Sequence, residues 1–479
     1  MNMTTSRRLF SAATSLALLS ANATAADQPP TLDDRLAPPP GGGLTAEQVA
    51  VRTRETSFDA AARREAIRSA EARVDQARAA YVPKLTLTGR YTRLSPLTQT
   101  IPLGAPTMGM AMPSSVALPT VFDQFLGQAS LTVPLTDYVL RLSQNYASAS
   151  RSRRAALLDE EAARLNAALS GRQAYYTWLR ARAQVIVAER SLEQARGHLI
   201  DARHAFEVGT TSKADVLRVE SQVAAAELVL EQSRNLAVLT EEQIRTAMHD
   251  KSTQPYAIGE DLRAEVPPSP NENPAALEAE AMDKRLEVRA LDETAWSLRE
   301  QAKSARAANY PRLDAFGDVI LANPNPRYFI QDNTFHTTWD VGLQLVWSPN
   351  DILSAGPQAR DAEARANQTE MQKAVLRDGI KIQVLQAYQV LKESEIAVET
   401  AKRGLASAEE GYRVRRELFR NGRATTVELL DSQADLTRDS INFVNARANL
   451  LVAKAALDHA TGRDILPGTL TGDGRPANK

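Results

Sequence analysis

The chain has 479 residues, of which 43% are hydrophobic, and it carries 57 Lys and Arg against 58 Asp and Glu. A net charge close to zero gives no indication of a nucleic acid or another polyanion as partner. The absence of cysteine excludes disulfides, thiolate metal sites, a cysteine nucleophile and an N-terminal lipid on cysteine. Low aromatic content with abundant Ala, Glu and Arg fits long helices.

Residues 1–26 are predicted to be a secretory signal peptide. Arg7 and Arg8 supply the positive start, residues 9–19 a short apolar core, and residues 21–26 small-residue cleavage sites. The two arginines fit a twin-arginine signal as well as a Sec signal. The apolar core is too short to span a bilayer, and no later stretch reaches about twenty apolar residues. A membrane location would therefore need a route other than a spanning helix.

The rest of the chain contains an internal repeat. Residues 44–260 and 273–462 are the two copies, and the proline-rich segment 261–272 links them. The flanking segments 27–43 and 463–479 are rich in Pro and Gly, and we expect them to be flexible. The matched order of features predicts helix, strand, strand, helix, turn and helix in each copy.

Each copy opens with a predicted helix. The first begins at Thr45 and runs to about Tyr81, where Pro83 stops it. The second begins at Asn273 and is stopped by Pro311, at the same spacing. We expect one uninterrupted helix in each copy.

After each proline the sequence alternates between apolar and polar residues, which is typical of strands with two different faces. Strands of about ten residues are typical of membrane barrels, and Trp339 and Trp347 on one face are expected to mark the two membrane interfaces. Four strands cannot close a barrel, but three copies of the chain would supply twelve. A soluble sandwich or a small sheet capping a helical bundle fits the same periodicity. The four predicted strands span about 84–94, 126–136, 312–322 and 338–348.

A glycine turn followed by a heptad helix also occurs twice. Gly209 and Gly422 suit the left-handed position that closes a helix, and Ser and Thr residues follow to cap the next one. Apolar residues then recur every seven positions, so each helix is expected to supercoil with its neighbours. An ordinary structural coiled coil and the wall of a channel both fit. The heptad residues are Val216, Val223, Leu230, Ala237 and Ile244, then Leu429, Leu436, Phe443, Leu450 and Leu457.

No catalytic, cofactor or metal site is predicted. The histidines are scattered, none forms H-E-x-x-H, and no phosphate-binding glycine loop follows a strand. Met108, Met110 and Met112 are a soft-metal alternative, but a flexible apolar loop accounts for them. The sequence therefore predicts a protein that is not an enzyme.

The duplicated arms, strand pairs and turns together resemble the TolC family of outer-membrane efflux proteins, from about Thr45 to Gly462. The arms read A-x-x-x-P-x-L (Ala79 to Leu85; Ala307 to Leu313), and the turns read F-x-x-G-x-x-x-x-x-[DE]-x-L. The resemblance implies a mostly α homotrimer. Its duplicated coiled-coil helices would form an α-helical barrel, and four strands per chain would contribute to a twelve-stranded outer-membrane β-barrel.

The resemblance also implies a function and a location. The protein would be the outer-membrane channel of a tripartite efflux or type I secretion system, extending into the periplasm and contacting outer-membrane lipid. It would be a passive exit duct, coupled through a periplasmic adaptor to an inner-membrane pump. Loops 95–125 and 322–337 would face outside. The alternative is a periplasmic coiled-coil adaptor or scaffold without a membrane barrel, which leaves the matched strand pairs unexplained.

Site residues follow from the resemblance at matching positions. The adaptor-docking tip would comprise Val208, Gly209, Thr210, Asn421, Gly422 and Arg423, although helix capping alone also accounts for the glycines. Rings of Asp215, Glu428 and Asp431 would bind cations at the periplasmic aperture, whereas a solvated helix face or a helix N-terminus accounts for the same residues.

One pair of positions departs from the family. The family's gate uses a tyrosine and an arginine, and this chain has Phe419 and Ala424 there. Any closing lock must therefore use other groups, with Arg420 and Arg423 as candidates. Drugs, metal ions, lipids and polypeptides all remain open as cargo.

Overall fold

A computed structural model describes residues 42–96, 100–102, 115–117, 121–261, 264, 272–328 and 332–464. Several predictions from the sequence concern segments outside the described residues. These are the signal peptide, nearly all of the N-terminal segment 27–43, most of the linker 261–272, the methionine loop and residues 465–479.

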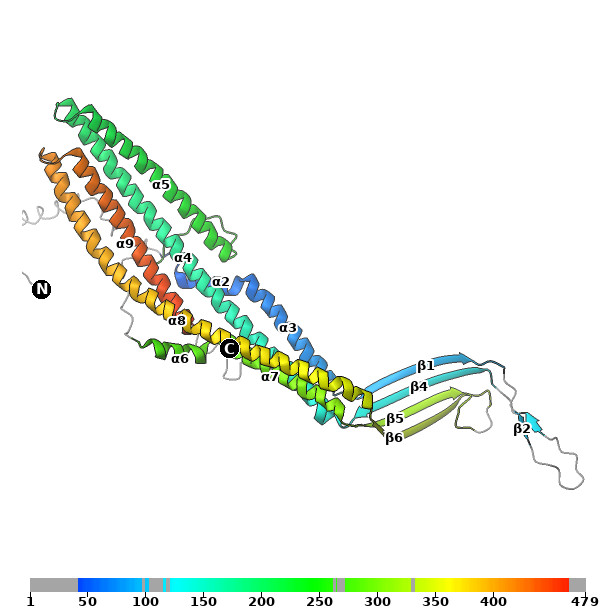
Figure 1. Cartoon of the computed structure of the whole chain (residues 1–479). Coiled ribbons are helices and arrows are strands. Elements are labelled where there is room, and N and C mark those ends of the chain that lie inside the picture. Colours follow the sequence, from blue (N-terminus) through cyan, green and yellow to red (C-terminus); the bar gives the residue numbers. More distant parts are fainter. Residues whose placement is uncertain are drawn as a thin grey trace, which may run out of the picture. The chain divides into compact units, whose positions relative to one another are not determined.

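The fold is mostly helical with one four-stranded sheet, which confirms the predicted combination of long helices and four strands per chain (Figure 1). None of the helices in the described part of the chain combines the length and apolar character that a membrane span requires. The helices are α2 (Ala46–Thr56), α3 (Phe58–Ala79), α4 (Ser143–Glu207), α5 (Lys213–Ala247), α6 (Pro274–Lys284), α7 (Leu286–Arg306), α8 (Pro349–Arg420) and α9 (Thr426–Ala460). The sheet has the order β1 (Lys84–Arg93), β4 (Asp123–Pro134), β5 (Arg312–Asn323) and β6 (His336–Val346), and β2 (Thr100–Pro102) pairs with β3 (Ser115–Ala117).

The chain divides into two compact units. One unit contains the C-terminal parts of α4 and α8, together with α5 and most of α9. The other contains the sheet, α3, α6, α7 and the N-terminal parts of α4 and α8. The first comprises residues 1–49, 171–270 and 392–453, and the second comprises residues 50–170, 271–391 and 454–479.

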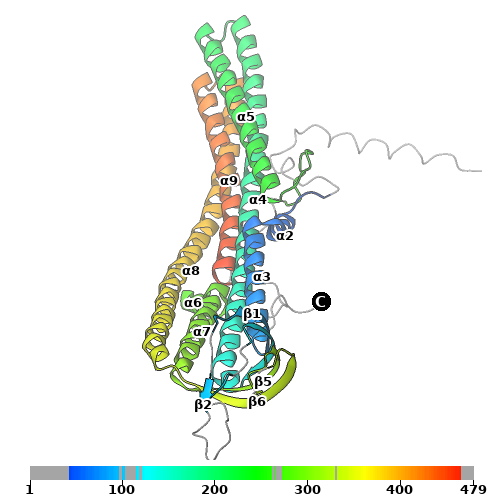
Figure 2. The ribbon, with the colours of Figure 1, turned by 90° about the vertical axis from the view of Figure 1, so that its right-hand side faces the viewer.

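In the first unit, α4 with α5 and α8 with α9 form two antiparallel hairpins (Figures 1 and 2). Their core is centred on Tyr175, Trp178 and Leu179, which are fully buried. Leu429 and Leu436 from α9 belong to the same cluster. The heptad residues are buried except for Val216 and Phe443, which are half-buried, so the predicted seam of the coiled coil is confirmed.

In the second unit, all neighbouring strands of the sheet are antiparallel, and their register sorts the side chains onto two faces. Thr86, Ser130, Asp318 and Asp340 lie opposite one another in one row, so this face is polar. The adjacent row, formed by Leu87, Ala129, Val319 and Trp339, belongs to the other face, which is apolar and exposed on β1 and β6. The exposed apolar residues of β1 and β6 are Leu85, Leu87, Tyr91, Trp339, Val341, Leu343 and Leu345.

The first helix of each repeat is broken, so the prediction of one uninterrupted helix was wrong. α2 ends at Thr56, and Ser57 caps α3 by accepting a 3.3 Å hydrogen bond from the amide of Ala60. At the equivalent point of the second repeat, the backbone of Arg285 is extended and separates α6 from α7. The buried side chain of Arg285 donates hydrogen bonds to Glu287. It also reaches Gln383 Oε1 and the carbonyl of Ala460. These partners are distant in sequence, which is why helical periodicity did not reveal the break.

Arg463, just after the end of α9, forms ion pairs with two glutamates, one at the end of the linker and one in α6. Its guanidinium lies 2.7 Å from Glu280 and 2.5 Å from Glu272. Hydrogen bonds from Arg463, and then from Lys284, lower the pKa of Glu280 to about 2. Because the pKa is lower in the folded state than the ordinary value of 4.5, the ion pair stabilises the fold fully above about pH 4.5, and this stabilisation is lost towards pH 2.

We expect Glu280→Gln to weaken the attachment of α6 by about 1 kcal/mol at pH 6, because the ion pair is partly exposed to solvent. The effect should shrink as the pH approaches 2, where the wild-type carboxylate also becomes protonated. Amide hydrogen exchange of α6 in the full chain measures this local opening free energy. Asp283→Asn, an exposed acid in the same helix, is the matched control. If the opening free energy of α6 differed between Glu280→Gln and the wild type by the same amount at pH 6 and at pH 2, the stabilising ion pair of Glu280 would be contradicted.

Candidate functional site

The turn between α4 and α5 is a Schellman motif built on Gly209. The glycine has a φ of +75°, and its amide donates to the carbonyl of Phe206 at 3.0 Å. The amide of Thr210 donates to the carbonyl of Ala205 at 2.8 Å. These two bonds satisfy carbonyls that the end of α4 would otherwise leave unpaired.

The turn between α8 and α9 repeats this geometry at Gly422. The φ of this glycine is +68°, and its amide donates to the carbonyl of Phe419 at 2.9 Å. The amide of Arg423 donates to the carbonyl of Leu418 at 2.8 Å. The capping role that the sequence suggests for both glycines is therefore present in the structure.

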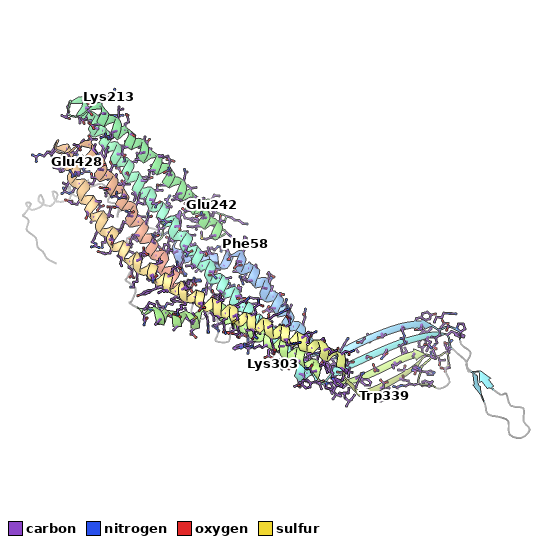
Figure 3. All side chains as sticks on the ribbon, in the orientation of Figure 1. Phe58, Lys213, Glu242, Lys303, Trp339 and Glu428 are labelled. Carbon is purple, nitrogen blue, oxygen red and sulfur yellow. The ribbon has the colours of Figure 1, made fainter. Side chains whose placement is uncertain are left out.

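Both turns are exposed in the first unit, where Figure 3 labels Lys213 and Glu428 just beyond them. A Cβ added at Gly209 or Gly422 would meet no atom of the described residues within 4 Å. Val208 is 74% exposed. The six predicted docking residues thus lie on two exposed turns, and their docking role remains a prediction.

Two of the three predicted aperture carboxylates take part in helix caps. Asp215 forms a capping box with Ser212, whose hydroxyl donates to Asp215 Oδ2 at 2.6 Å and accepts from the Asp215 amide. Glu428 accepts a 2.9 Å bond from the amide of Thr425 and lies 3.2 Å from Arg415. Asp431 lies on the exposed surface of α9.

These caps also affect the charges of the two carboxylates. The hydrogen bond from Ser212 lowers the pKa of Asp215, and the bond from the Thr425 amide, with help from Arg415, lowers the pKa of Glu428. Both residues therefore stay ionised at neutral pH, although their oxygens are partly occupied by neighbouring donors.

A groove that the sequence analysis missed lies between α4, α5 and α9 in the first unit. It encloses a cavity of about 370 Å³. Each of the three helices contributes small side chains to the lining, and these leave the space open. The apolar lining consists of Ala188, Ala225, Ala226, Val229, Ala434 and Ile441, and the polar lining of Ser191, Gln222, Thr437, Arg438 and Asn442.

Polar contacts between the two hairpins were also missed. Gln433 donates to the carbonyl of Ser191 at 3.1 Å, and Thr437 lies 3.2 Å from the Ser191 hydroxyl. Gln184 donates to Asn445 at 3.0 Å. The partners are more than 200 residues apart in the chain, so no local pattern could have paired them.

The position of the family's gate tyrosine has a different role here. Phe419 packs against the core cluster of the first unit and has no hydroxyl group to donate. Arg420 and Arg423 are exposed. The structure therefore places none of the predicted lock candidates in a buried contact between the hairpins.

The two predicted interface tryptophans lie on the exposed apolar side of the sheet in the second unit. Trp339 on β6 is 69% exposed, and Trp347, directly after the strand, is 54% exposed. Figure 3 labels Trp339 on the sheet. The apolar side chains between the two tryptophans are exposed as well, and the place of the tryptophans at the membrane interfaces remains a prediction.

Comparisons with known proteins agree on one family. The sequence model of the outer membrane efflux protein family matches residues 49–248 and 279–463. The outer membrane efflux protein BepC of Brucella suis is 22% identical over 283 residues, which cover 57% of this chain and 58% of that protein. The alignment therefore spans less than two thirds of BepC.

Solved structures share the fold at low sequence identity. The outer-membrane channel OprN superposes with a TM-score of 0.70 and 17% identity, over 90% of this chain and 91% of that chain. The MtrE outer membrane channel of Neisseria gonorrhoeae, solved in its open state, gives a TM-score of 0.69 and 14% identity, over 88% and 89%.

Proposed function

The chain belongs to the outer membrane efflux protein family, and from this premise we propose that it is a passive exit duct in the outer membrane that extends into the periplasm. The observation that carries the proposal is the four-stranded sheet with one polar face and one exposed apolar face. Such a sheet fits lipid on one side and a water-filled lumen on the other.

The edges of this sheet support a homotrimer. Among the described strands, β1 pairs only with β4, and β6 only with β5, so both edges are open. Open edges are costly in lipid, because unpaired backbone groups find no water there. Three copies joined edge to edge would close a twelve-stranded barrel and remove every open edge.

Exposed apolar side chains on the long helices support the same assembly. Leu217, Leu228 and Leu239 on α5 are each more than half exposed and recur every eleven residues, which keeps them near one face of the helix. Val375 and Ile382 on α8 are exposed as well. Burial against neighbouring copies would explain why helices with buried seams carry a second apolar face.

We propose that the groove and the two turns receive a periplasmic adaptor, which couples the duct to an inner-membrane pump. The groove is lined by apolar residues, mostly alanines, together with polar residues, a combination that suits the apolar face of a helix. The exposed turns at Gly209 and Gly422 would form the rest of the docking surface. The system would be a tripartite efflux or type I secretion machine.

We also propose that Asp215, Glu428 and Asp431 form carboxylate rings at the aperture of the trimer. Asp431 would contribute most, because the oxygens of Asp215 and Glu428 already accept hydrogen bonds from their caps. Three copies of each carboxylate would concentrate cations electrostatically.

The duct itself is tested by recording purified full-length protein in planar lipid bilayers. We expect stepwise ionic conductance that is stable at low voltage. A protein that inserts into the bilayer and never conducts would contradict the proposed duct.

A prediction concerns Gly422. Replacement by Val puts a β-branched side chain at a φ of +68°, which costs about 1–2 kcal/mol locally, while its Cβ would meet no atom of the described chain within 4 Å. We expect export to fall more than tenfold while the amount of trimer in the membrane is unchanged, because the added bulk occupies the docking surface. Export is measured as accumulation of a fluorescent efflux substrate.

Gly422→Asn separates docking from capping. Asparagine tolerates the left-handed conformation, so it preserves the turn while adding a side chain. Docking predicts loss of export with both Val and Asn, whereas capping alone predicts loss with Val only. A fall in the amount of trimer that parallels the loss of export would support the capping role.

A further inference from the structure

Two buried polar side chains, one on α4 and one on α8, connect the two hairpins. His198 on α4 is 4% exposed and Tyr412 on α8 is 6% exposed. His198 Nε2 lies 2.8 Å from the Tyr412 hydroxyl, and the rings meet edge to face at 5.8 Å. Because one residue belongs to the α4–α5 hairpin and the other to the α8–α9 hairpin, the contact holds the two hairpins together.

The surroundings of His198 disfavour a positive charge. Burial is the main cause that lowers the pKa of His198, and Arg416 and Arg420 on α8 lower it further. Asp201 on α4 acts in the opposite direction and offsets part of this effect. The packed contact therefore holds a neutral imidazole at neutral pH.

We propose that His198 and Tyr412 form a proton-sensitive latch, which holds the α8–α9 hairpin against the α4–α5 hairpin at neutral pH and releases it in acid. The latch rests on the proposed function, because its release would open the aperture of the duct. It also supplies a closing contact for a chain that has Phe419 and Ala424 at the family's gate positions.

The sign of the pH effect follows from proton linkage. A released hairpin exposes His198 to water, where its pKa returns to about 6.5. Above that pH both states carry a neutral imidazole, and the latch stabilises the closed state fully. Below it the released state binds the proton more tightly, so the ratio of released to closed chains rises by up to about tenfold per pH unit. The rise ends when the pH falls below the pKa of the packed histidine.

Protonation of His198 would release the latch because it adds a buried charge, and not because it removes a hydrogen bond. The tyrosine oxygen can still accept a hydrogen bond from a protonated imidazole, so the contact would survive in water. In the packed site, however, the new charge would be buried and would face Arg416 and Arg420, and the opposite charge of Asp201 would offset only part of this cost. Opening of the contact removes this penalty.

The test is the open probability of the full-length protein in planar bilayers between pH 7.5 and pH 5. We expect the open probability of the wild type to rise about tenfold or more across this range. His198→Gln, which keeps a hydrogen-bonding group that cannot be charged, should show a flat response. His204→Gln is the matched control, since His204 lies on the same helix with its side chain 73% exposed. It should respond like the wild type.

A second measurement tests the latch independently of ion conductance. Amide hydrogen exchange of residues 413–425 in the full-length protein, corrected for intrinsic rates, should accelerate below pH 6.5 in the wild type and not in His198→Gln. Tyr412→Phe should accelerate exchange already at pH 7.5. An unchanged pH response in His198→Gln by both measurements would overturn the latch. Absence of conductance with a pH-dependent exchange would overturn the duct and leave the latch supported.

Discussion

Leu343→Arg is expected to remove most of the protein from the outer membrane. Leu343 lies in the middle of β6, is 69% exposed, and belongs to the apolar face with Val341 and Leu345. An arginine on the lipid face near the bilayer midplane costs about 2–4 kcal/mol, which corresponds to roughly 30- to 1,000-fold in the assembly equilibrium. In a trimer each copy would carry this cost. The amount of protein in purified outer membranes measures the loss.

Gln344→Arg is the matched control for this substitution. Gln344 follows Leu343 directly and therefore points to the opposite, polar face of the sheet, opposite Asp314 in register. An arginine there would face the water-filled lumen, and we expect the amount in the membrane to stay within about twofold of the wild type. Equal losses for the two variants would show that the apolar face does not contact lipid.

Ala434→Trp is expected to abolish export while leaving the trimer intact. Ala434 is an exposed residue of α9 that lines the groove, so a tryptophan can enter the cavity of about 370 Å³ without displacing the buried core. It would occupy space that a docked helix needs. We expect a loss of more than about 2 kcal/mol of adaptor affinity, roughly thirtyfold. Substrate accumulation in cells reports the loss of export.

Two further variants make this result specific to the groove. Ala434→Ser changes the same position without filling the cavity and should export normally. Ala225→Trp fills the groove from α5 and should reproduce the loss. Normal export by Ala434→Trp and Ala225→Trp together would rule out the groove as a docking site.

The features predicted correctly from the sequence depend on local patterns. The period of seven after each glycine turn marked the residues that became buried, such as Leu230 and Leu436. The period of two after each proline marked the strands and their apolar faces. Gly209 and Gly422 were recognised because a left-handed helix end strongly favours glycine, and both have positive φ. Each of these signals lies in the same stretch of the chain as the helix, strand or turn that it predicts.

The features that the sequence did not reveal depend on contacts between distant segments. The helix break at Arg285 is stabilised by Gln383 and the carbonyl of Ala460. The contact of His198 with Tyr412 joins residues on different repeats, and a buried histidine on a charged helix has no periodic signature. The groove exists because alanines of three helices coincide in space. Only the packed structure brings these groups together.

The central claim is that three copies of this chain form one duct in the outer membrane. The most direct test is to purify the outer membrane of the producing cell and to compare the protein on a denaturing gel with and without heating. The proposed function predicts an oligomer of about three chain masses in the outer-membrane fraction, which heating converts to the single chain. A soluble or inner-membrane monomer in both samples would contradict it.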